Sequence, residues 1–477
     1  MILTLNYAKY NLLNEKRVKA VKNIIFKSKL NNTYIYNDTT GLIFHIDDVE
    51  NIPEFLEPYE KLRRSLIVQP LHTPNTVKNS LYQQARGFNQ LILEVTTSCN
   101  FRCKYCIYSD HYATTRKHGF DFMTIDTAQK AVDYFFKGFS FVRQRDALKI
   151  PTITFYGGEP LLKFELIKDI VVYVNRKYPN ITTKYSITTN GSLLTDEIGY
   201  FLSQHDFSVL ISLDGYKENH DRNRVDVNGN KTFDLVFAKY QELKKNYPKL
   251  DVEISCCYDF KTNMQKLATF LDENEIALGM LSQVDPVNST FYDQFSVLDR
   301  NSFQKSYKIE FEKFVDCVSN VETAHNLSIL GKWFYKLTKQ LSTHPVMENS
   351  NSSCIPGEKI YVCANGNFKI CEKVSDSFNI GDVYSGLDFE KICSLLNQFQ
   401  RFKLKRCENC EISHMCTVCF HDCCIDEDAI VSQNFCSTTK QAAQQFLAQY
   451  VNISEQNPFA YDDQTNSYYS TCLGEVM

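Results

Sequence analysis

The sequence has no run of about 18 apolar residues, the length that a helix needs to cross a membrane. Its first residues, Met1–Lys9, lack the basic and then long apolar pattern of a secretory signal peptide. Strong positive charge is also missing, because 52 Lys and Arg stand against 56 Asp and Glu, whereas nucleic-acid-binding domains are usually basic. We find no internal repeat. These absences predict a cytoplasmic protein that binds neither membranes nor nucleic acid.

Cysteine, in contrast, is abundant. The chain has 477 residues, 43% of them hydrophobic and 23% charged, which fits an ordinary globular protein of two to four domains. It contains 18 cysteines, of which 12 lie at or after Cys354. In a reducing cytosol, so many cysteines in close pairs indicate metal binding rather than disulfides.

Three of the cysteines are concentrated in eight residues, Cys99-Asn-Phe-Arg-Cys103-Lys-Tyr-Cys106, directly after the apolar run Leu91–Val95. Three thiolates can hold a [4Fe–4S] cluster by three of its irons and leave the fourth iron open to a small molecule. A closed zinc site needs four ligands and fits poorly. Three unrelated core cysteines are the plainer alternative.

The stretch from residue 89 to about 285 alternates short apolar runs with amphipathic helical stretches, which indicates a parallel sheet. In parallel β/α barrels the chemistry lies on loops at the carboxyl ends of the strands. The cysteine loop follows the first expected strand, and other polar motifs follow later ones. The expected strands are 91–96, 152–156, 185–188, 209–213, 252–257 and, more weakly, 278–284.

The C-x3-C-x2-C spacing is typical of radical S-adenosylmethionine (radical SAM) enzymes. Four further motifs follow it in the family's order: Tyr156–Pro160, Thr189–Gly191, Ser212–Gly215 and His220–Arg224. Over about residues 89–440 the chain therefore resembles radical SAM enzymes with a C-terminal SPASM domain. The resemblance implies an α/β fold: a partial (β/α)6 barrel with a small N-terminal α+β domain and a C-terminal cysteine-rich iron–sulfur domain.

The resemblance also assigns roles at the first site. Cys99, Cys103 and Cys106 would hold the cluster that binds S-adenosylmethionine, the cofactor that carries the hard chemistry. The expected contacts of that cofactor are the backbone of Tyr105, the glycines Gly157 and Gly158, Glu159 on the amino group, Ser212, Asn190, and Arg224 on the carboxylate. Several have a plainer explanation: a tight turn for the glycines, a turn for Ser212 and a surface ion pair for Arg224.

A second group of cysteines resembles the SPASM pattern and implies two auxiliary [4Fe–4S] clusters. Cys354, Cys371 and Cys419 would hold the first, and Cys407, Cys410, Cys416 and Cys436 the second. The spacing departs from the family by one residue before Cys419, so that Cys423 and Cys424 are alternative ligands. The fourth ligand of the first auxiliary cluster is either Cys363 or the thiolate of a substrate. A zinc-ribbon-like site built from the two C-x2-C pairs is the structural alternative.

These patterns predict five segments. Residues 1–88 form an N-terminal domain with a β-hairpin around Asn37–Gly41, which acts either as a leader-peptide binder or as a structural cap on the barrel. Residues 89–285 form the barrel, 286–350 a helical bridge, 351–440 the SPASM-like domain, and 441–477 a C-terminal tail.

The predicted function is that of a radical SAM oxidoreductase. A 5′-deoxyadenosyl radical abstracts a hydrogen atom, and a side chain of a ribosomally made (RiPP) precursor peptide is crosslinked or modified, with thioether formation favoured. An external donor such as flavodoxin or ferredoxin would supply electrons. One alternative is an anaerobic sulfatase-maturing enzyme that oxidises Cys or Ser to formylglycine in a protein, for which Glu372 is a weak catalytic candidate. Another is a non-enzymatic iron–sulfur electron-transfer protein.

Overall fold

The computed structural model describes twelve stretches of the chain: residues 2–5, 23–38, 41–46, 71–112, 117–287, 289–319, 354–375, 378–407, 410–413, 415–416, 418–422 and 433–458. It divides into two compact units. The larger unit consists of residues 72–307 and 354–395, and the smaller of residues 1–71, 308–353 and 396–477. No helix among the described residues has both the length and the apolar character of a membrane span.

The larger unit is built on one sheet of ten strands in the order β10-β9-β8-β7-β6-β5-β11-β12-β13-β14, and β5 to β10 are all parallel to their neighbours. Every residue of β5 from Leu91 to Thr96 is buried, as expected for a parallel strand covered on both faces. All six expected strands are confirmed. They are β5 (Gln90–Thr96), β6 (Thr152–Gly157), β7 (Lys184–Thr189), β8 (Phe207–Ser212), β9 (Asp251–Tyr258) and β10 (Leu278–Gln283).

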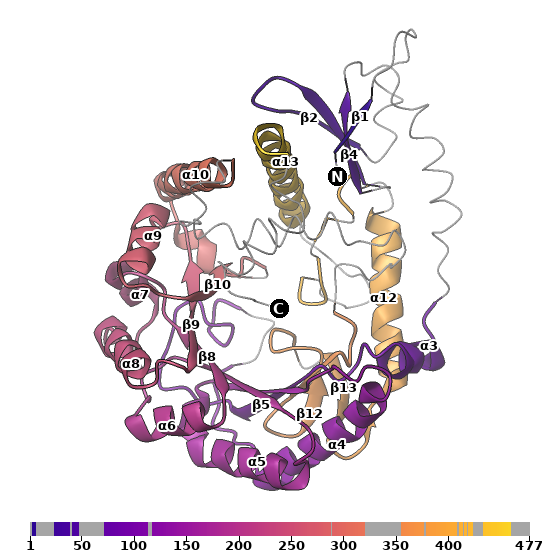
Figure 1. Ribbon diagram of the computed structural model, residues 1–477, viewed down its shortest axis with the longest axis vertical. Helices are drawn as coiled ribbons and strands as arrows, with labels where there is room; N and C mark the ends of the chain where they lie inside the picture. Colours follow the sequence, from indigo (N-terminus) through magenta and orange to yellow (C-terminus); the bar gives the residue numbers. More distant parts are fainter. Residues whose placement is uncertain are drawn as a thin grey trace. The chain divides into compact units, whose positions relative to one another are not determined.

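Helices follow these strands and lie along the outer face of the curved sheet (Figure 1). In α4, the Thr124 side chain caps the first turn by accepting the N–H of Thr127 at 3.1 Å, and Phe135 and Phe139 are completely buried. The helices of this unit are α3 (Pro74–Lys78), α4 (Ile125–Arg143), α5 (Phe164–Lys177), α6 (Asp196–Gln204), α7 (Lys217–Asn223), α8 (Phe233–Asn246) and α9 (Met264–Glu273). Shorter helical turns are η2 (Asn79–Gln83), η3 (Pro160–Lys163) and η4 (Phe291–Gln294).

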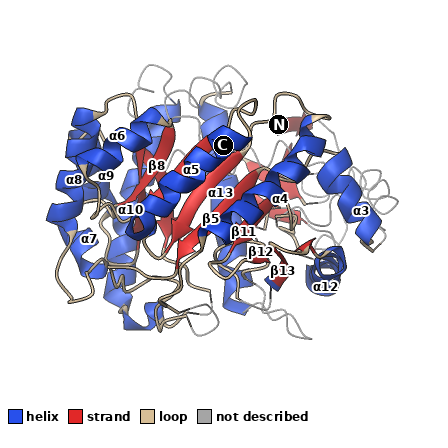
Figure 2. Cartoon of the chain, turned by 90° about the horizontal axis from the view of Figure 1, so that it is seen from below, coloured by secondary structure: helices blue, strands red, loops and turns tan. Residues whose placement is uncertain are grey.

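Four C-terminal strands extend the same sheet beyond β5, and Figure 2 shows three of them, β11 to β13, next to it. β11 (Lys359–Val362) pairs parallel to β5, with Tyr361 opposite Ile92. β12 (Asn367–Lys369), β13 (Asn379–Asp382) and β14 (Gly386–Leu387) continue antiparallel. The first half of the expected SPASM-like segment is therefore part of the barrel sheet.

The smaller unit contains the N-terminal strands β1 (Ile2–Leu5), β2 (Asn23–Lys27), β3 (Thr33–Asn37) and β4 (Leu42–Ile46) in the order β1-β4-β3-β2. The expected hairpin is confirmed, because β3 and β4 pair antiparallel around residues 38–41. Tyr34 and Tyr36 from this sheet pack in one core with Leu447 and Tyr450 of α13 (Gln433–Gln456).

Two long helices lead from one unit into the other along the chain: α10 (Val297–Ser319) and α12 (Phe389–Cys407). Helix α13 runs through residue 440, where the C-terminal tail was expected to begin. Most of the expected helical bridge, residues 320–350, lies outside the described residues. The five predicted segment boundaries stay predictions.

A glycine on α4 gives a test of the packing between this helix and the segment that precedes β5. A Cβ atom at Gly138 would lie 2.6 Å or less from ring atoms of Phe88, which is completely buried. Gly→Ala at an exposed helix position stabilises by about 1 kcal/mol. Here we expect Gly138→Ala to destabilise by about 1–3 kcal/mol, because the Phe88 ring cannot move away. Urea unfolding followed by circular dichroism measures the effect.

The matched control is Ser140→Ala, an exposed position on the same helix, for which we expect little change. A Gly138→Ala protein as stable as the unaltered chain would show that α4 does not approach Phe88 as described.

Candidate active site

The predicted site residues converge on the edge of the sheet where the parallel strands end. The cysteine loop follows β5, Gly157 ends β6, Asn190 follows β7 and Ser212 ends β8. Since β5, β6, β7 and β8 are consecutive neighbours, their carboxyl ends form one continuous edge. The topology therefore gathers these motifs as the sequence predicts.

The cysteine loop is held by backbone hydrogen bonds to the segment that follows α7. The Arg102 N–H donates to the Val225 carbonyl at 2.7 Å, and the Lys104 N–H donates to the Asn223 carbonyl at 2.9 Å. In return the Val227 N–H donates to the Asn100 carbonyl at 3.2 Å. The His220–Arg224 motif thus leads directly into a strand-like support for the three cysteines.

Gly157 and Gly158 press against the other side of this loop. The Gly158 N–H donates to the Thr96 carbonyl and the Glu159 N–H to the Ser98 carbonyl, both at 2.8 Å. A Cβ atom at Gly158 would overlap the Ser98 carbonyl and lie 3.0 Å from the Cys99 nitrogen. The structure therefore requires glycine here for the close approach of two backbones, whatever else the glycines contact.

Glu159 is a buried carboxylate that ties two loops together, those after β6 and β7. Its oxygens accept the Leu161 N–H at 3.0 Å, the Thr189 hydroxyl at 2.6 Å and the Asn190 N–H at 2.7 Å. Burial is the main cause that raises the pKa of Glu159 to about 7, and these hydrogen bonds partly offset the increase. The predicted contact with an amino group of the cofactor stays a prediction.

The three thiols lie close together and receive N–H donors. Burial is the main cause that raises the pKa of Cys99 and of Cys106 to about 12, and the neighbouring Cys103 raises both further. Cys99 Sγ accepts the Phe101 N–H at 3.3 Å and the Asn190 side-chain amide at 3.9 Å. Such donors stabilise thiolates, the form in which cysteine binds iron. The donor set therefore fits an iron–sulfur cluster.

Arg224 lies beside the second thiol. Its Nη1 donates to Cys103 Sγ at 3.9 Å, and its Nε forms an ion pair with Asp214 at 3.0 Å. The Tyr105 hydroxyl donates to the same carboxylate, and the Arg224 guanidinium lies 5.3 Å from the centre of the Tyr105 ring. The sequence places Asp214 in the Ser212–Gly215 motif without indicating a role for its side chain. The structure shows that Asp214 connects Arg224 with the cysteine loop.

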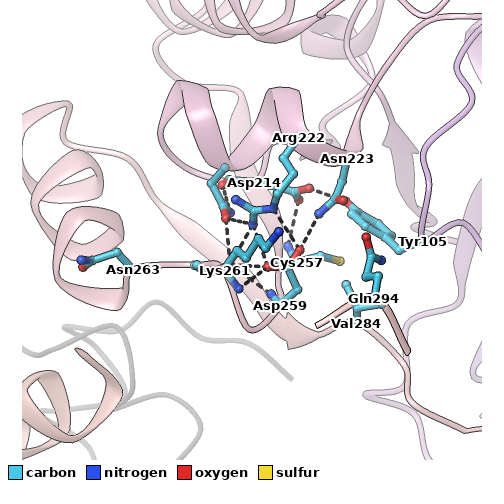
Figure 3. Close-up of polar contacts among 12 residues, drawn as sticks. Tyr105, Asp214, Arg222, Asn223, Cys257, Asp259, Lys261, Asn263, Val284 and Gln294 are labelled. Carbon is cyan, nitrogen blue, oxygen red and sulfur yellow. Dashed lines mark hydrogen bonds and ion pairs between the residues drawn. The ribbon is translucent and has the colours of Figure 1, made fainter. Parts of the chain in front are cut away.

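A second buried carboxylate, Asp259 after β9, was missed from the sequence (Figure 3). It accepts Arg222 Nη2 and the Asn223 side-chain amide, each at 2.8 Å. Asp259 is 1% exposed, so that its negative charge is stabilised by the ion pair with Arg222 and not by contact with water. An acidic residue at the carboxyl end of a predicted strand was the available signal. Asp259 anchors the end of α7, from which the support of the cysteine loop continues.

A third carboxylate, Glu94 on β5, connects the cysteine loop with the C-terminal strands. It accepts the hydroxyls of Tyr108 at 3.1 Å and Tyr361 at 2.8 Å, and the Ala364 N–H at 3.2 Å. Tyr108 lies two residues after Cys106, and Tyr361 lies on β11. The segment that contains the first auxiliary cysteines is therefore fixed to the first site through one buried residue.

The larger unit contains three of the predicted auxiliary residues together with Glu372. Burial is the main cause that raises the pKa of Cys371 to about 11, and the nearby Glu372 and Cys354 contribute to the increase. Cys354 and Cys371 therefore lie near each other. Cys363 is 6% exposed and packs with Ile92 and Tyr361, a setting that fits a small core residue. Its ligation stays a prediction.

The smaller unit gathers the cysteines predicted for the second auxiliary cluster. Burial raises the pKa of Cys416 to about 12, and the neighbouring Cys407 and Cys410 add to the shift. Lys403, four residues before Cys407 on α12, neighbours all three. Lys440, four residues after Cys436 on α13, neighbours Cys410 and Cys436 and pairs with Glu411 at 2.8 Å. Two positively charged lysines therefore lie near the cysteines predicted to act as thiolate ligands.

Cys419 has a different environment. Its N–H donates to the Asp422 carboxylate at 2.7 Å, and burial followed by Asp422 raises the pKa of its thiol to about 12. The alternative ligands, Cys423 and Cys424, lie outside the described residues.

Among the residues that the structure describes, no three His, Cys, Asp or Glu side chains converge tightly enough to hold a single metal ion. The thiolates of a four-iron cluster bind separate irons, and so they lie farther apart than the ligands of one ion.

Known proteins resemble the chain over the same region. The model of the radical SAM superfamily matches residues 93–272. A cysteine-type anaerobic sulfatase-maturating enzyme of Clostridium novyi is 26% identical over 239 residues, which cover 48% of this chain and 62% of that protein. The radical SAM cyclopropyl synthase TigE of Paramaledivibacter caminithermalis is 24% identical over 302 residues, or 60% of each chain. The matches thus span less than two thirds of these relatives.

A solved structure, native anSMEcpe with bound AdoMet, shares the fold with a TM-score of 0.59 at 22% identity, covering 77% of this chain and 99% of that one. The chain therefore shares with this structure an α/β fold with a large, mostly parallel sheet, which is consistent with a radical SAM partial barrel. The match of the superfamily model, together with the cysteine loop at the strand ends, identifies residues 93–272 as a radical SAM domain.

Proposed function

We propose that this chain is a radical SAM enzyme that oxidises a side chain of a peptide or protein substrate. The observation that carries the proposal is the three-cysteine loop at the edge where the parallel strands end. Backbone hydrogen bonds hold the loop segment to Gly158 on one side and to residues 223–227 on the other. An electron-transfer protein needs no site for S-adenosylmethionine. In support, relatives named as sulfatase-maturating enzymes match 48% and 41% of the chain.

When bound, the cluster and S-adenosylmethionine supply a 5′-deoxyadenosyl radical that abstracts a hydrogen atom. Cys99, Cys103 and Cys106 hold the cluster, and Glu159 keeps the loops after β6 and β7 in register around it. Asn190 donates to Cys99. Arg224 aside, the contacts proposed for the cofactor itself are those predicted from the sequence, with Ser212 at the end of β8.

The C-terminal cysteines extend the proposal to auxiliary clusters, which would accept the electron released when the substrate radical is oxidised. Cys407, Cys410, Cys416 and Cys436 hold one of them, supported by their neighbourhood with Lys403 and Lys440. Cys354 and Cys371 contribute to the other, with Cys419 or Cys423. An external flavodoxin-like or ferredoxin-like donor reduces the first cluster.

Two products fit this proposal. One is a crosslinked peptide, thioether formation being the favoured case; the other is formylglycine in a sulfatase-like protein. The relatives include both sulfatase-maturating enzymes and a cyclopropyl synthase, and they support the two products equally. Glu372, next to Cys371, is a weak catalytic candidate for the second reaction.

The cluster content can be measured directly. Anaerobically reconstituted protein should hold about twelve iron atoms, and the Cys99→Ala/Cys103→Ala/Cys106→Ala variant about eight, because each [4Fe–4S] cluster contributes four. The same variant should lose dithionite-dependent cleavage of S-adenosylmethionine, measured by chromatography of 5′-deoxyadenosine. A matched control is Cys256→Ala, a buried cysteine on β9 outside the predicted ligand set, which should keep its iron.

Two results would contradict this prediction. If cleavage of S-adenosylmethionine survives the triple substitution, the assignment of the first site is wrong. If the protein holds about four iron atoms together with zinc, the assignment of the auxiliary clusters is wrong.

The product class can be tested with a known peptide. The Cp18Cys peptide is bound in one solved relative. A crosslinking enzyme should leave this peptide unchanged, whereas a sulfatase-maturing enzyme would convert its Cys to formylglycine, which loses two hydrogens and exchanges sulfur for oxygen. Mass spectrometry distinguishes the two, with anSMEcpe, which binds this peptide, as the positive control. If this chain converts the Cys of the peptide, its product is formylglycine and the crosslinking alternative is wrong.

A further inference from the structure

Arg224 is placed against a cluster ligand rather than on an open surface. It is 7% exposed and follows α7. Its guanidinium reaches Cys103 Sγ through Nη1 at 3.9 Å and Asp214 through Nε at 3.0 Å. The planar fork of an arginine can serve two partners in this way, which a lysine cannot. The geometry thus gives Arg224 two fixed partners within the chain.

Asp214 holds the guanidinium in that position. The carboxylate is completely buried, and it accepts the Tyr105 hydroxyl and, at 2.9 Å, the Cys257 N–H (Figure 3). It also forms the ion pair with Arg224. With these partners Asp214 is engaged from three elements: the cysteine loop, β9 and the end of α7. Burial opposes the charge of Arg224, but the attraction of Asp214, Tyr105 and Cys103 outweighs it and raises its pKa. The group therefore stays cationic.

The neighbouring thiol has a different kind of donor. Cys99 Sγ receives the Phe101 N–H and the Asn190 amide, which are both neutral. Cys103 Sγ receives a charged donor, and a charge-assisted hydrogen bond in a buried site is stronger than a neutral one. Hydrogen bonds to sulfur and the net charge near an iron–sulfur cluster set its reduction potential.

We propose that Arg224, held by Asp214, donates to the Cys103 thiolate and thereby raises the reduction potential of the S-adenosylmethionine-binding cluster. Reduction adds one electron from the external donor and no proton, so that the reduced cluster carries one more negative charge. A fixed cation beside one of its thiolates stabilises that form. The inference rests on the cluster of the proposed function and is independent of the peptide substrate. It gives Arg224 a role other than the predicted contact with the methionine carboxylate.

The test is an EPR-monitored redox titration of the reconstituted protein without S-adenosylmethionine, with the auxiliary signal of the triple-cysteine variant subtracted. Arg224→Gln should make reduction about tenfold less favourable, which corresponds to a fall of about 59 mV for one electron. Arg145→Gln removes an exposed arginine that precedes β6 and should change nothing.

A second measurement separates this role from cofactor binding. The affinity of the oxidised protein for S-adenosylmethionine, measured by equilibrium dialysis, should change less than about threefold in Arg224→Gln, well under the 1.4 kcal/mol of a tenfold change. An unchanged potential combined with an affinity more than about tenfold weaker would overturn the proposal and leave Arg224 as a carboxylate ligand.

If Arg224→Gln retains no iron, Arg224→Lys replaces it. Lysine keeps the charge but cannot span Asp214 and Cys103 together, so that the potential should still fall; an unchanged potential overturns the proposal. Should the unaltered protein show no cluster signal that depends on Cys99, Cys103 and Cys106, the proposed function itself fails. A cluster that is present but insensitive to Arg224 refutes the role of Arg224 alone.

Discussion

The site depends on one backbone interaction, the pairing of the cysteine loop with residues 223–227. A loop with three cysteines in eight residues has no regular structure of its own, so that its N–H and C=O groups need partners from elsewhere in the chain. The Arg102 and Lys104 N–H groups find them in the carbonyls of Val225 and Asn223. This pairing fixes the direction of the thiols and places the end of α7, with Arg224, against Cys103. The positions of the remaining groups follow from it.

Buried ion pairs maintain that arrangement at some cost in desolvation. Asp214 and Asp259 are 0% and 1% exposed and are matched by Arg224 and Arg222. Hydrophobic residues of similar volume would often stabilise a fold as well as such pairs do, so that the pairs are better explained by the geometry they impose. Each joins the loop after one strand to the end of α7. Together with Glu94 and Glu159, which bind neutral donors, they form a set of carboxylates that connects successive loops around the cysteines.

Much of this could be predicted from the sequence, because apolar runs and motif order are local signals. The six strands appear within two residues of their expected ends, and the cysteine loop, Gly157, Asn190 and Ser212 share one edge as expected. What was missed depends on contacts between residues far apart in the chain. Asp259 looks like any acidic residue after a strand until Arg222 is placed beside it. The pairing of β11 with β5 joins residues about 270 positions apart, and no periodicity signals which partner a four-residue strand will choose.

The two alternatives for the N-terminal segment are a leader-peptide binder and a cap on the barrel, and the packing of its sheet bears on both. Tyr34 and Tyr36 share a core with Ile412, Met415 and α13, and the partly buried Cys410 and Cys416 pack against that core. Asp38, in the turn of the hairpin, accepts the Ser413 hydroxyl at 2.6 Å. The sheet therefore supports the loop that carries two predicted auxiliary ligands. A short cysteine-rich loop cannot bury enough apolar surface to order itself, and here the N-terminal strands and α13 supply that surface. Within its own unit, the structural role of the sheet is to hold the loop of Cys410 and Cys416 in place.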